Sequence, residues 1–321
     1  MIQAAIPGSV ALVDTIANAN LQPLSSLLTS PERLKIFHAA QQDLEVFELS
    51  GFAKFTNLFD CQIAAALIGL DEQIGYGALV SKLLDIDLDK SQTRTDWTKR
   101  PLSSAQKDYA VNDVRYLKEL YELMENELQN LGRYQWLQED CSRLHYAVST
   151  QRRCSIAWRK VKGYASLDDE PLANLASLAN WRERLAQDKN LPRNWVLQDT
   201  QLIELAIKKP SDLSRLAKLL PGHNALLRQH GASLLCALEV GATSNWSGLS
   251  RPVVLGPEQR KWVKSMKIFV KKKAQDLNLN PSILCSSSDL TSIARGNIPT
   301  RLRSGWRVQF LNEVLDSAGE S

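Results

Sequence analysis

Short apolar runs in the first 60 residues have the character of β-strands. They lie at residues 9 to 16, 34 to 37 and 58 to 60, and the first is rich in β-branched side chains. Pro7-Gly8 precedes the first run and predicts a turn, so we expect the chain to open with two short strands.

Between and after these runs, apolar residues recur with helical spacing. This spacing predicts helices at residues 21 to 28, 43 to 49, 63 to 70 and 77 to 84. A longer helical pattern runs from residue 103 to 131 and ends at Gly132, a common residue after a helix C-terminus. Strands that alternate with helices predict an α/β domain.

After about residue 165 every segment has a helical pattern, and an internal repeat is present. Residues 186 to 206 align without gaps on residues 274 to 294, with seven identical positions of 21. The repeat predicts two small helical domains, at residues 168 to 245 and 256 to 321. The linkers are expected at residues 245 to 252 and, rich in Arg and Lys, 149 to 163.

The composition is that of an ordinary globular protein with room for two or three domains. The chain has 321 residues, of which 44% are hydrophobic and 23% charged. The N-terminal segment has no basic residue and carries Asp14, which argues against a signal peptide, and no run reaches the roughly 18 apolar residues of a membrane span. The five cysteines are widely spaced without CxxC pairs, so neither disulfides nor a zinc site is expected. We therefore predict a cytoplasmic protein with no membrane partner.

Charge is distributed unevenly between the two halves. Residues 1 to 150 carry 13 Lys and Arg against 20 Asp and Glu, and residues 151 to 321 carry 26 against 15. An acidic half beside a basic half suits a nuclease, whose acidic site binds metal while another surface binds the polyanion. The alternative is that basic helical domains are merely soluble.

The strongest chemical signal is a tyrosine and an aspartate four residues apart on a predicted helix. In Tyr109-Ala-Val-Asn-Asp113 this spacing places both side chains on one face. The preceding loop, residues 93 to 101, is rich in Arg, Lys and Trp. A metal-assisted phosphodiesterase needs an oxygen ligand for Mg²⁺, a hydroxyl that orients water, and cations for phosphates. An ordinary half-buried pair on a surface helix is the alternative.

Several segments together resemble a known family. Phe37-His-Ala-Ala-Gln-Gln-Asp-Leu-Glu-Val-Phe47, Leu58-Phe-Asp-Cys-Gln-Ile, and the stretch from Leu88 to Asp113 are similar to successive exonuclease segments of bacterial ribonuclease D. Trp181-Arg-Glu through Leu191-Pro-Arg-Asn resembles the family's paired helicase-and-ribonuclease-D C-terminal (HRDC) domains. The family is a tyrosine-bearing branch of the DEDD 3′-to-5′ exoribonucleases.

The resemblance implies an architecture and a reaction. It implies a ribonuclease H-like α/β exonuclease domain at residues 1 to 148, followed by two all-α HRDC bundles. The expected activity is trimming of structured RNA 3′ ends, such as those of tRNA precursors, with release of nucleoside 5′-monophosphates. The implied cofactors are two divalent ions, Mg²⁺ or Mn²⁺, and the implied partner is RNA. The oligomeric state is not predicted.

The resemblance also assigns site residues. Asp43 and Asp113 correspond to metal ligands, and Tyr109 corresponds to the hydroxyl that orients water. The family's first motif, Asp-x-Glu on the first strand, lies upstream of the strand that Met1-Ile-Gln-Ala-Ala5 resembles, so the domain is expected to be N-terminally truncated. Loss of two of four carboxylates predicts weak or absent paired metal binding, and loss of a central strand predicts unpaired strand edges.

Basic residues near these motifs are candidates for contact with RNA phosphates. The candidates are Arg94, Lys99 and Arg100 in the loop, and Lys271, Lys272 and Lys273 in the second helical repeat. Lys264, Lys267, Arg301, Arg303 and Arg307 are expected to extend the second group. A solvated helix face is the alternative.

Structural roles compete with functional ones at other positions. Asp43 suits the first turn of a helix, Asp60 suits a helix N-cap, and His38 suits a core position. Tryptophans at helical spacing or in the loop are expected to pack internally: Trp97, Trp181, Trp195, Trp262 and Trp306. For the whole chain, the alternatives are a catalytically inactive RNA-binding remnant that uses the basic repeats, and a fragment whose start lies upstream.

Overall fold

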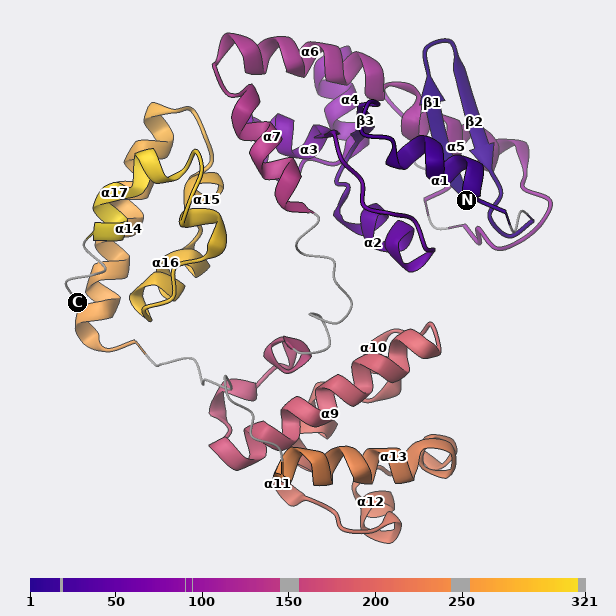
Figure 1. The fold of residues 1–321 in the computed structure, drawn as a ribbon, viewed down its shortest axis with the longest axis vertical. Coiled ribbons are helices and arrows are strands. Elements are labelled where there is room, and N and C mark those ends of the chain that lie inside the picture. The colour runs from indigo at the N-terminus through magenta and orange to yellow at the C-terminus, as the bar shows by residue number, and fades with distance from the viewer. Residues whose placement is uncertain (18–19, 90, 94, 145–155, 244–254, 317–321) are drawn as a thin grey trace. The chain divides into compact units, whose positions relative to one another are not determined.

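The computed structural model describes residues 1–17, 20–89, 91–93, 95–144, 156–243 and 255–316. The chain forms two compact units (Figure 1). The first unit combines residues 1–147 with residues 255–321, and the second unit is formed by residues 148–254. Among the described residues, no helix is both long and apolar enough to cross a membrane.

The chain opens with an antiparallel hairpin, as predicted. Strand β1 (Ile2–Ile6) pairs with β2 (Ser9–Val13), and Gly8 occupies the turn with φ of 79°. This backbone conformation favours glycine because a Cβ would clash with the backbone. Helix α5 (Ser104–Arg115) packs against both strands of the hairpin.

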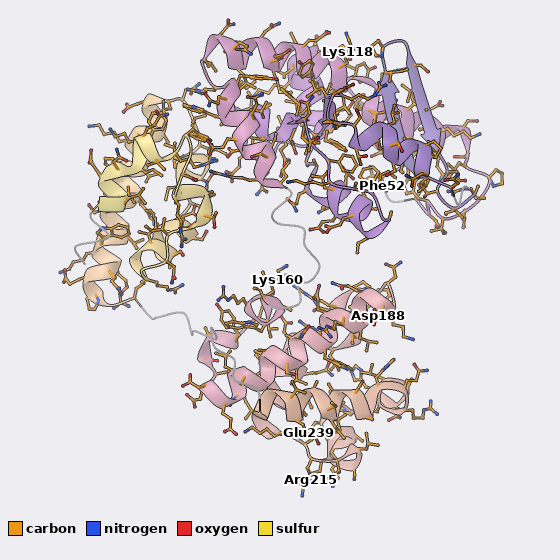
Figure 2. The ribbon with its side chains drawn as sticks, in the orientation of Figure 1. Phe52, Lys118, Lys160, Asp188, Arg215 and Glu239 are labelled. Atoms are coloured by element: carbon orange, nitrogen blue, oxygen red, sulfur yellow. The ribbon has the colours of Figure 1, made fainter. Side chains whose placement is uncertain are left out.

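A second pair of strands is parallel, and one helix lies between them in the sequence. Strand β3 (Lys35–Phe37) pairs with β4 (Leu58–Asp60), in register from Lys35 with Leu58 to Phe37 with Asp60. In the described part of the chain the four strands form two separate two-stranded sheets. The predicted helices are confirmed as α1 (Gln22–Thr29), α2 (Gln41–Leu49), α3 (Cys61–Leu67) and α4 (Tyr76–Leu84). Phe52 packs against Phe47 of α2, with ring centroids 4.9 Å apart (Figure 2).

The long helical pattern after residue 103 is interrupted, which the sequence did not predict. Helix α5 ends at Arg115, α6 (Leu117–Asn130) follows, and α7 (Tyr134–Arg143) comes after the turn at Gly132. At the break, the backbone N–H of Tyr116 donates to the hydroxyl of Tyr76, at 3.2 Å. A side chain forty residues away thus takes the donor that would have continued the helix.

In its described residues, 156–243, the second unit has helices and no strands. These residues include two 3₁₀ turns and five α-helices, namely Ala157–Lys160, Tyr164–Ser166, α9 (Asp169–Asp188), α10 (Arg193–Val196), α11 (Asp199–Lys208), α12 (Leu213–Leu219) and α13 (Asn224–Thr243). Trp158 is buried in its core. The predicted linker at residues 149 to 163 is therefore too long, because its second half packs into this core. The other predicted linker, residues 245 to 252, lies outside the described residues.

The remaining helices belong to the first unit. They are α14 (Pro257–Asp276), α15 (Pro281–Leu284), α16 (Ser287–Ala294) and α17 (Val308–Asp316), with a 3₁₀ turn at Thr300–Leu302. They share one hydrophobic core with α3, α6 and α7. Trp136 of α7 stacks on Trp306 at 4.2 Å between ring centroids. Arg133, also beside α7, donates to the carbonyl oxygens of both Leu67 and Leu277.

The sequence repeat corresponds to a repeated backbone. Helices α14, α15 and α16 begin 88 residues after α9, α10 and α11. Asn190 and Asn278, at equivalent positions, both have φ of 50°. The N–H groups of Leu191 and Leu279 donate to equivalent carbonyls, each at 2.8 Å. The two copies therefore share one local fold despite limited sequence identity.

Most of the predicted core tryptophans are indeed packed. Trp306 is buried, and Trp181 and Trp262 are partly buried against the two hydrophobic cores. Trp195 is different, because 74% of its surface is exposed. The expectation that Trp195 packs internally is wrong: the buried residues of its helical turn are Val196 and the following Leu197.

Candidate active site

Asp60 organises the turn that carries Asp43. Its buried carboxylate accepts hydrogen bonds from the N–H groups of Ala39 and Ala40, at 3.2 and 2.8 Å. It also accepts from Gln62 and Ile63 as the N-cap of α3, which confirms the predicted capping role. One carboxylate thus holds together the start of α2 and the start of α3.

Asp43 lies in the first turn of α2 and is exposed. Neighbouring protein nevertheless displaces water around its carboxylate, and this desolvation raises its pKa above the ordinary value. The negative charge of Asp60 acts in the same direction. Asp43 is therefore a carboxylate in a negative environment.

A capping box fixes the helix that carries Tyr109 and Asp113. The side chain of Ser103 accepts from the N–H of Gln106, and Gln106 accepts from the N–H of Ser103. The amide of Gln106 also donates to Thr95 and to the carbonyl of Asp96, at 3.3 and 3.4 Å. The basic loop is thereby tied to the first turn of α5.

Tyr109 faces this loop. Its hydroxyl lies 3.5 Å from the hydroxyl of Thr93, and its ring lies 5.8 Å from that of Trp97. Both Tyr109 and Trp97 are partly buried. This placement agrees with the interpretation of Trp97 as a packing residue and leaves the tyrosine hydroxyl at the edge of the loop.

Asp113 is half-buried, one helical turn beyond Tyr109. Burial raises its pKa to about 6. Its charge in turn contributes to a raised pKa at Tyr76, after the larger effect of burial. The ring of His38 packs edge-on against Tyr76, at 5.8 Å.

These contacts relate the two predicted metal ligands to each other. Asp113 interacts electrostatically with Tyr76, Tyr76 contacts His38, and both His38 and Asp43 respond to the charge of Asp60. The pKa of His38 is lowered by burial, although Asp60 opposes this effect. A series of contacts through Tyr76, His38 and Asp60 thus connects Asp113 with Asp43 within the first unit.

The carboxylate oxygens of Asp43 and Asp113 are of the kind that hard divalent cations bind. Mg²⁺ and Mn²⁺ prefer carboxylate oxygens, and both aspartates have raised pKa values from desolvation. Among the described residues, however, no group of three or more His, Cys, Asp or Glu side chains is close enough to hold a metal ion. The assignment of Asp43 and Asp113 as metal ligands therefore stays a prediction.

The cations of the basic loop, residues 93 to 101, differ in whether protein groups already pair with them. Arg100 forms a two-pronged ion pair with Asp14, at 2.5 and 2.7 Å, and donates to two loop carbonyls. The pairing of Asp14 with this loop was not predicted from the sequence. Lys99 is exposed, and Arg94 lies outside the described residues. Contact of these residues with RNA stays a prediction.

The basic residues of the C-terminal helices fall into two groups. Lys271 and Lys272 are exposed on α14, and Lys273 is partly exposed over the ring of Phe269. Arg307 is buried and forms a two-pronged ion pair with Asp140 of α7, at 2.6 and 2.8 Å. The prediction that Arg307 extends an RNA-binding patch is wrong, because this guanidinium is internal.

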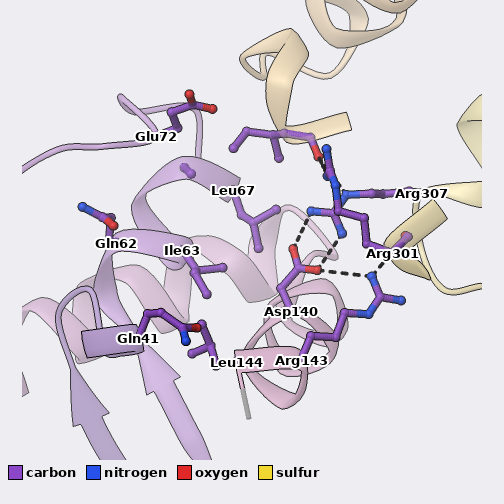
Figure 3. A pocket seen from close by; sticks show the side chains of 12 residues that line it. Gln41, Gln62, Ile63, Leu67, Glu72, Asp140, Arg143, Leu144, Arg301 and Arg307 are labelled. Carbon is purple, nitrogen blue, oxygen red and sulfur yellow. Dashed lines mark hydrogen bonds and ion pairs between the residues drawn. The ribbon is translucent and has the colours of Figure 1, made fainter. Parts of the chain in front are cut away.

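A pocket of about 320 Å³ lies beside this ion pair (Figure 3). Gln41 and Gln62 line one part, and Arg143, Arg301 and Arg307 line another. The arginines donate to Asp140 and to backbone carbonyls. None of Asp43, Tyr109 and Asp113 lines this pocket, so it is separate from the candidate active site.

Comparison with known proteins adds family evidence to this geometry. A family described as 3′-5′ exonuclease matches residues 1–129, and the HRDC domain family matches residues 172–238. Ribonuclease D of Jannaschia sp. (strain CCS1) is 37% identical over 322 residues, which cover 96% of this chain and 82% of the relative. Ribonuclease D of Sphingobium indicum is 35% identical over 328 residues, covering 98% and 84%.

Solved structures agree. The crystal structure of Escherichia coli RNase D, described as an exoribonuclease involved in structured RNA processing, matches with a TM-score of 0.84 and 29% identity, covering 99% of this chain and 87% of that one. The catalytic core of RRP6 from Trypanosoma brucei matches with a TM-score of 0.55 at 19% identity, covering 74% and 67%, which supports the fold alone. The chain matches the exonuclease and HRDC families, and it is 35% to 37% identical to two ribonucleases D over nearly its whole length. This chain therefore belongs to the ribonuclease D family.

Proposed function

We propose that this chain is a 3′-to-5′ exoribonuclease that trims the 3′ ends of structured RNA, such as tRNA precursors. The observation that carries the proposal is the ribonuclease D similarity over 96% to 98% of the chain. It favours an enzyme over an inactive RNA-binding remnant. Cytoplasmic location is part of the proposal.

The proposed domain organisation follows the sequence boundaries. Residues 1–148 form the exonuclease domain and residues 168–245 the first HRDC domain, which is supported by the family match at 172–238. Residues 256–321 form a second HRDC domain, supported by the repeated helix register and the paired Asn190 and Asn278 conformations.

The proposed active site uses Asp43, Asp113 and Tyr109. The two carboxylates hold divalent ions, either Mg²⁺ or Mn²⁺, which stabilise negative charge on the phosphate when bound. The family pattern of two ions needs further carboxylates beyond these two aspartates. Since the pKa of Asp113 is about 6, most of this carboxyl is ionised at neutral pH and available as a ligand.

The chain's own residues orient the substrates of hydrolysis. The hydroxyl of Tyr109, at the edge of the basic loop, positions the attacking water. The water oxygen bonds to phosphorus, the bond from phosphorus to the 3′ oxygen of the preceding nucleotide breaks, and that oxygen receives a proton. The products are a nucleoside 5′-monophosphate and an RNA one nucleotide shorter.

The test compares an active-site variant with a neighbour on the same helix. A tRNA precursor with a labelled 3′ end is incubated with Mg²⁺ or Mn²⁺ and the native chain, Asp113→Asn or Asp108→Asn. Asp108 is exposed on α5 and serves as the control. We expect Asp113→Asn to lose roughly 100-fold or more in rate, as removal of transition-state electrostatics commonly does, while Asp108→Asn retains it.

Two results would contradict the proposal. Equal rates for Asp113→Asn and the native chain would remove Asp113 from the site. A native chain that binds the precursor but releases no nucleotide would favour the inactive RNA-binding remnant.

A further inference from the structure

Trp195 is exposed to solvent, and the backbone that carries it is anchored to the core of the second unit. The residue is 74% exposed, and nearby Leu191 is 42% exposed. Directly after Trp195, Val196 and Leu197 are buried. The buried guanidinium of Arg182 donates to the carbonyl of Leu197, at 2.8 Å, and to Asp199, at 2.9 Å. The exposed indole therefore projects from a backbone that the core fixes in place.

The equivalent segment of the C-terminal copy is a docking surface. The carbonyl of Leu277 accepts a hydrogen bond from Arg133, at 2.6 Å, and the backbone of Asn278 lies against Gly69. Ser282 donates to Glu72, and Ile283 lines the pocket beside α3 and α7. In that copy the segment that follows α14, residues 277 to 283, thus packs against the N-terminal part of the first unit.

Several positions of this segment differ between the copies, and three of the differences change what the surface can bind. Lys189 replaces Leu277, Arg193 replaces Pro281, and Trp195 replaces Ile283, whereas the aspartate that ends the preceding helix is kept as Asp188 and Asp276. Asp188 marks this end of α9 in Figure 2. The first copy therefore presents the same backbone with two added cations and one flat aromatic ring.

We propose that Lys189, Leu191, Arg193 and Trp195, here named the α10 surface, bind unpaired RNA nucleotides. Trp195 stacks on a base, while exposed Lys189 and half-buried Arg193 attract the adjacent phosphates. Stacking on an aromatic ring next to cations is the common way to bind single strands without sequence preference. The choice of RNA rests on the proposed function. The exchange of apolar docking residues for cations favours a polyanion over a protein partner.

The test measures binding without hydrolysis. Fluorescence anisotropy follows a labelled oligoadenylate of about 12 nucleotides, a length within the usual range for single-strand sites, with the full chain in EDTA. We expect Trp195→Ala to weaken binding roughly tenfold and Trp195→Phe to retain most of it. Lys189→Gln should reduce the slope of log K against log salt by about 1. Ile207→Ala, which truncates a 53% exposed side chain on α11, is the matched control.

The outcomes separate this inference from the proposed function. Equal affinity for Trp195→Ala and the Ile207→Ala control overturns the α10 surface but leaves the Asp113 assay unaffected. A change of oligomeric state on Trp195→Ala by light scattering, with unchanged RNA affinity, also overturns it and identifies a protein interface. A tenfold loss supports it, even if the native chain hydrolyses no RNA.

Discussion

At the level of single residues, a buried arginine supports the second unit. Arg182 is 1% exposed, and its donors bond to the carbonyl of Leu197 and to Asp199. Burial alone would lower the pKa of this guanidinium and raise that of Asp199, but their mutual attraction opposes both effects. The pair therefore depends on both partners being present.

Removal of one partner should be costly. We expect Arg182→Leu to reduce the free energy of unfolding by about 3 kcal/mol, because Asp199 and the carbonyl of Leu197 lose their donor. Urea denaturation of the full chain measures this loss. Arg184→Leu changes an exposed arginine on the same helix and should cost less than about 0.5 kcal/mol. Similar losses for both variants would show that the buried pair has no special role.

A second residue-scale prediction concerns Gly305. Its φ is 93°, and a Cβ there would lie 1.7 Å from Oε1 of Glu139. Glu139 has little freedom to move, because Arg143 pairs with it at 2.6 Å and the N–H of Trp306 donates to it at 2.9 Å. We expect Gly305→Ala to destabilise the first unit by about 2 kcal/mol, from backbone strain and displacement of this glutamate.

The double variant separates these two causes. If Glu139→Ala is added, the steric part disappears and only the strain of the positive φ remains, so the two losses should be less than additive. Thermal unfolding of the four proteins provides the cycle. Strict additivity would mean that Gly305 and Glu139 do not interact.

At the level of elements, the acidic cap of α16 links stability to pH. Burial would raise the pKa of Asp289, but hydrogen bonds from Ser286 and Arg301 outweigh it, and the pKa lies below its ordinary value. A carboxylate with a lowered pKa in the folded state stabilises the protein above its unfolded pKa of about 4. That contribution is lost as the pH falls from about 4 through the folded pKa.

We therefore expect Asp289→Asn to lower the melting temperature at pH 7 and to flatten its decline below pH 4. Melting temperatures of the native chain and the variant between pH 3 and 7 check this, with Asp276→Asn as a control near the end of α14. If the difference in melting temperature between the native chain and the variant were the same at pH 3 and pH 7, ionisation of Asp289 would not contribute to stability.

Elements that depend on local pattern were predictable from the sequence. The hairpin followed from Pro7-Gly8, and the cap of α5 is visible as a serine with a glutamine three residues later. The break at Tyr116 was not predictable, because the hydroxyl of Tyr76 causes it through a tertiary contact. Propensity describes a segment's own preference, and such a contact overrides it.

In the candidate site, too, features set by local sequence were predictable and features set by tertiary contacts were not. The spacing of Tyr109 and Asp113 was readable because a helix turns them to one face. The pairing of Arg100 with Asp14 was not, since it joins a loop to the end of a hairpin 86 residues away. Trp195 was misjudged because helical spacing predicts a face, whereas exposure depends on what covers that face.

At the level of the whole molecule, two segments distant in sequence form one unit. Residues 1–147 and 255–321 share a core, and Arg307 pairs with Asp140 of α7 where they meet. Of these two side chains, Arg307 retains 7% exposure and Asp140 12%. The arrangement implies that the C-terminal helices contribute to the stability of the exonuclease domain.

Arg307→Gln tests that implication. Loss of one partner of a buried pair should cost about 3 kcal/mol, because Asp140 would stay buried without its cation. If the segments fold as one unit, hydrogen exchange should rise together in α7 and α14, although α7 is unchanged in sequence. Arg303→Gln, an exposed neighbour, should leave both rates unchanged. Faster hydrogen exchange in α14 with full protection of α7 would instead show two independently stable segments. The C-terminal helices would then not stabilise α7.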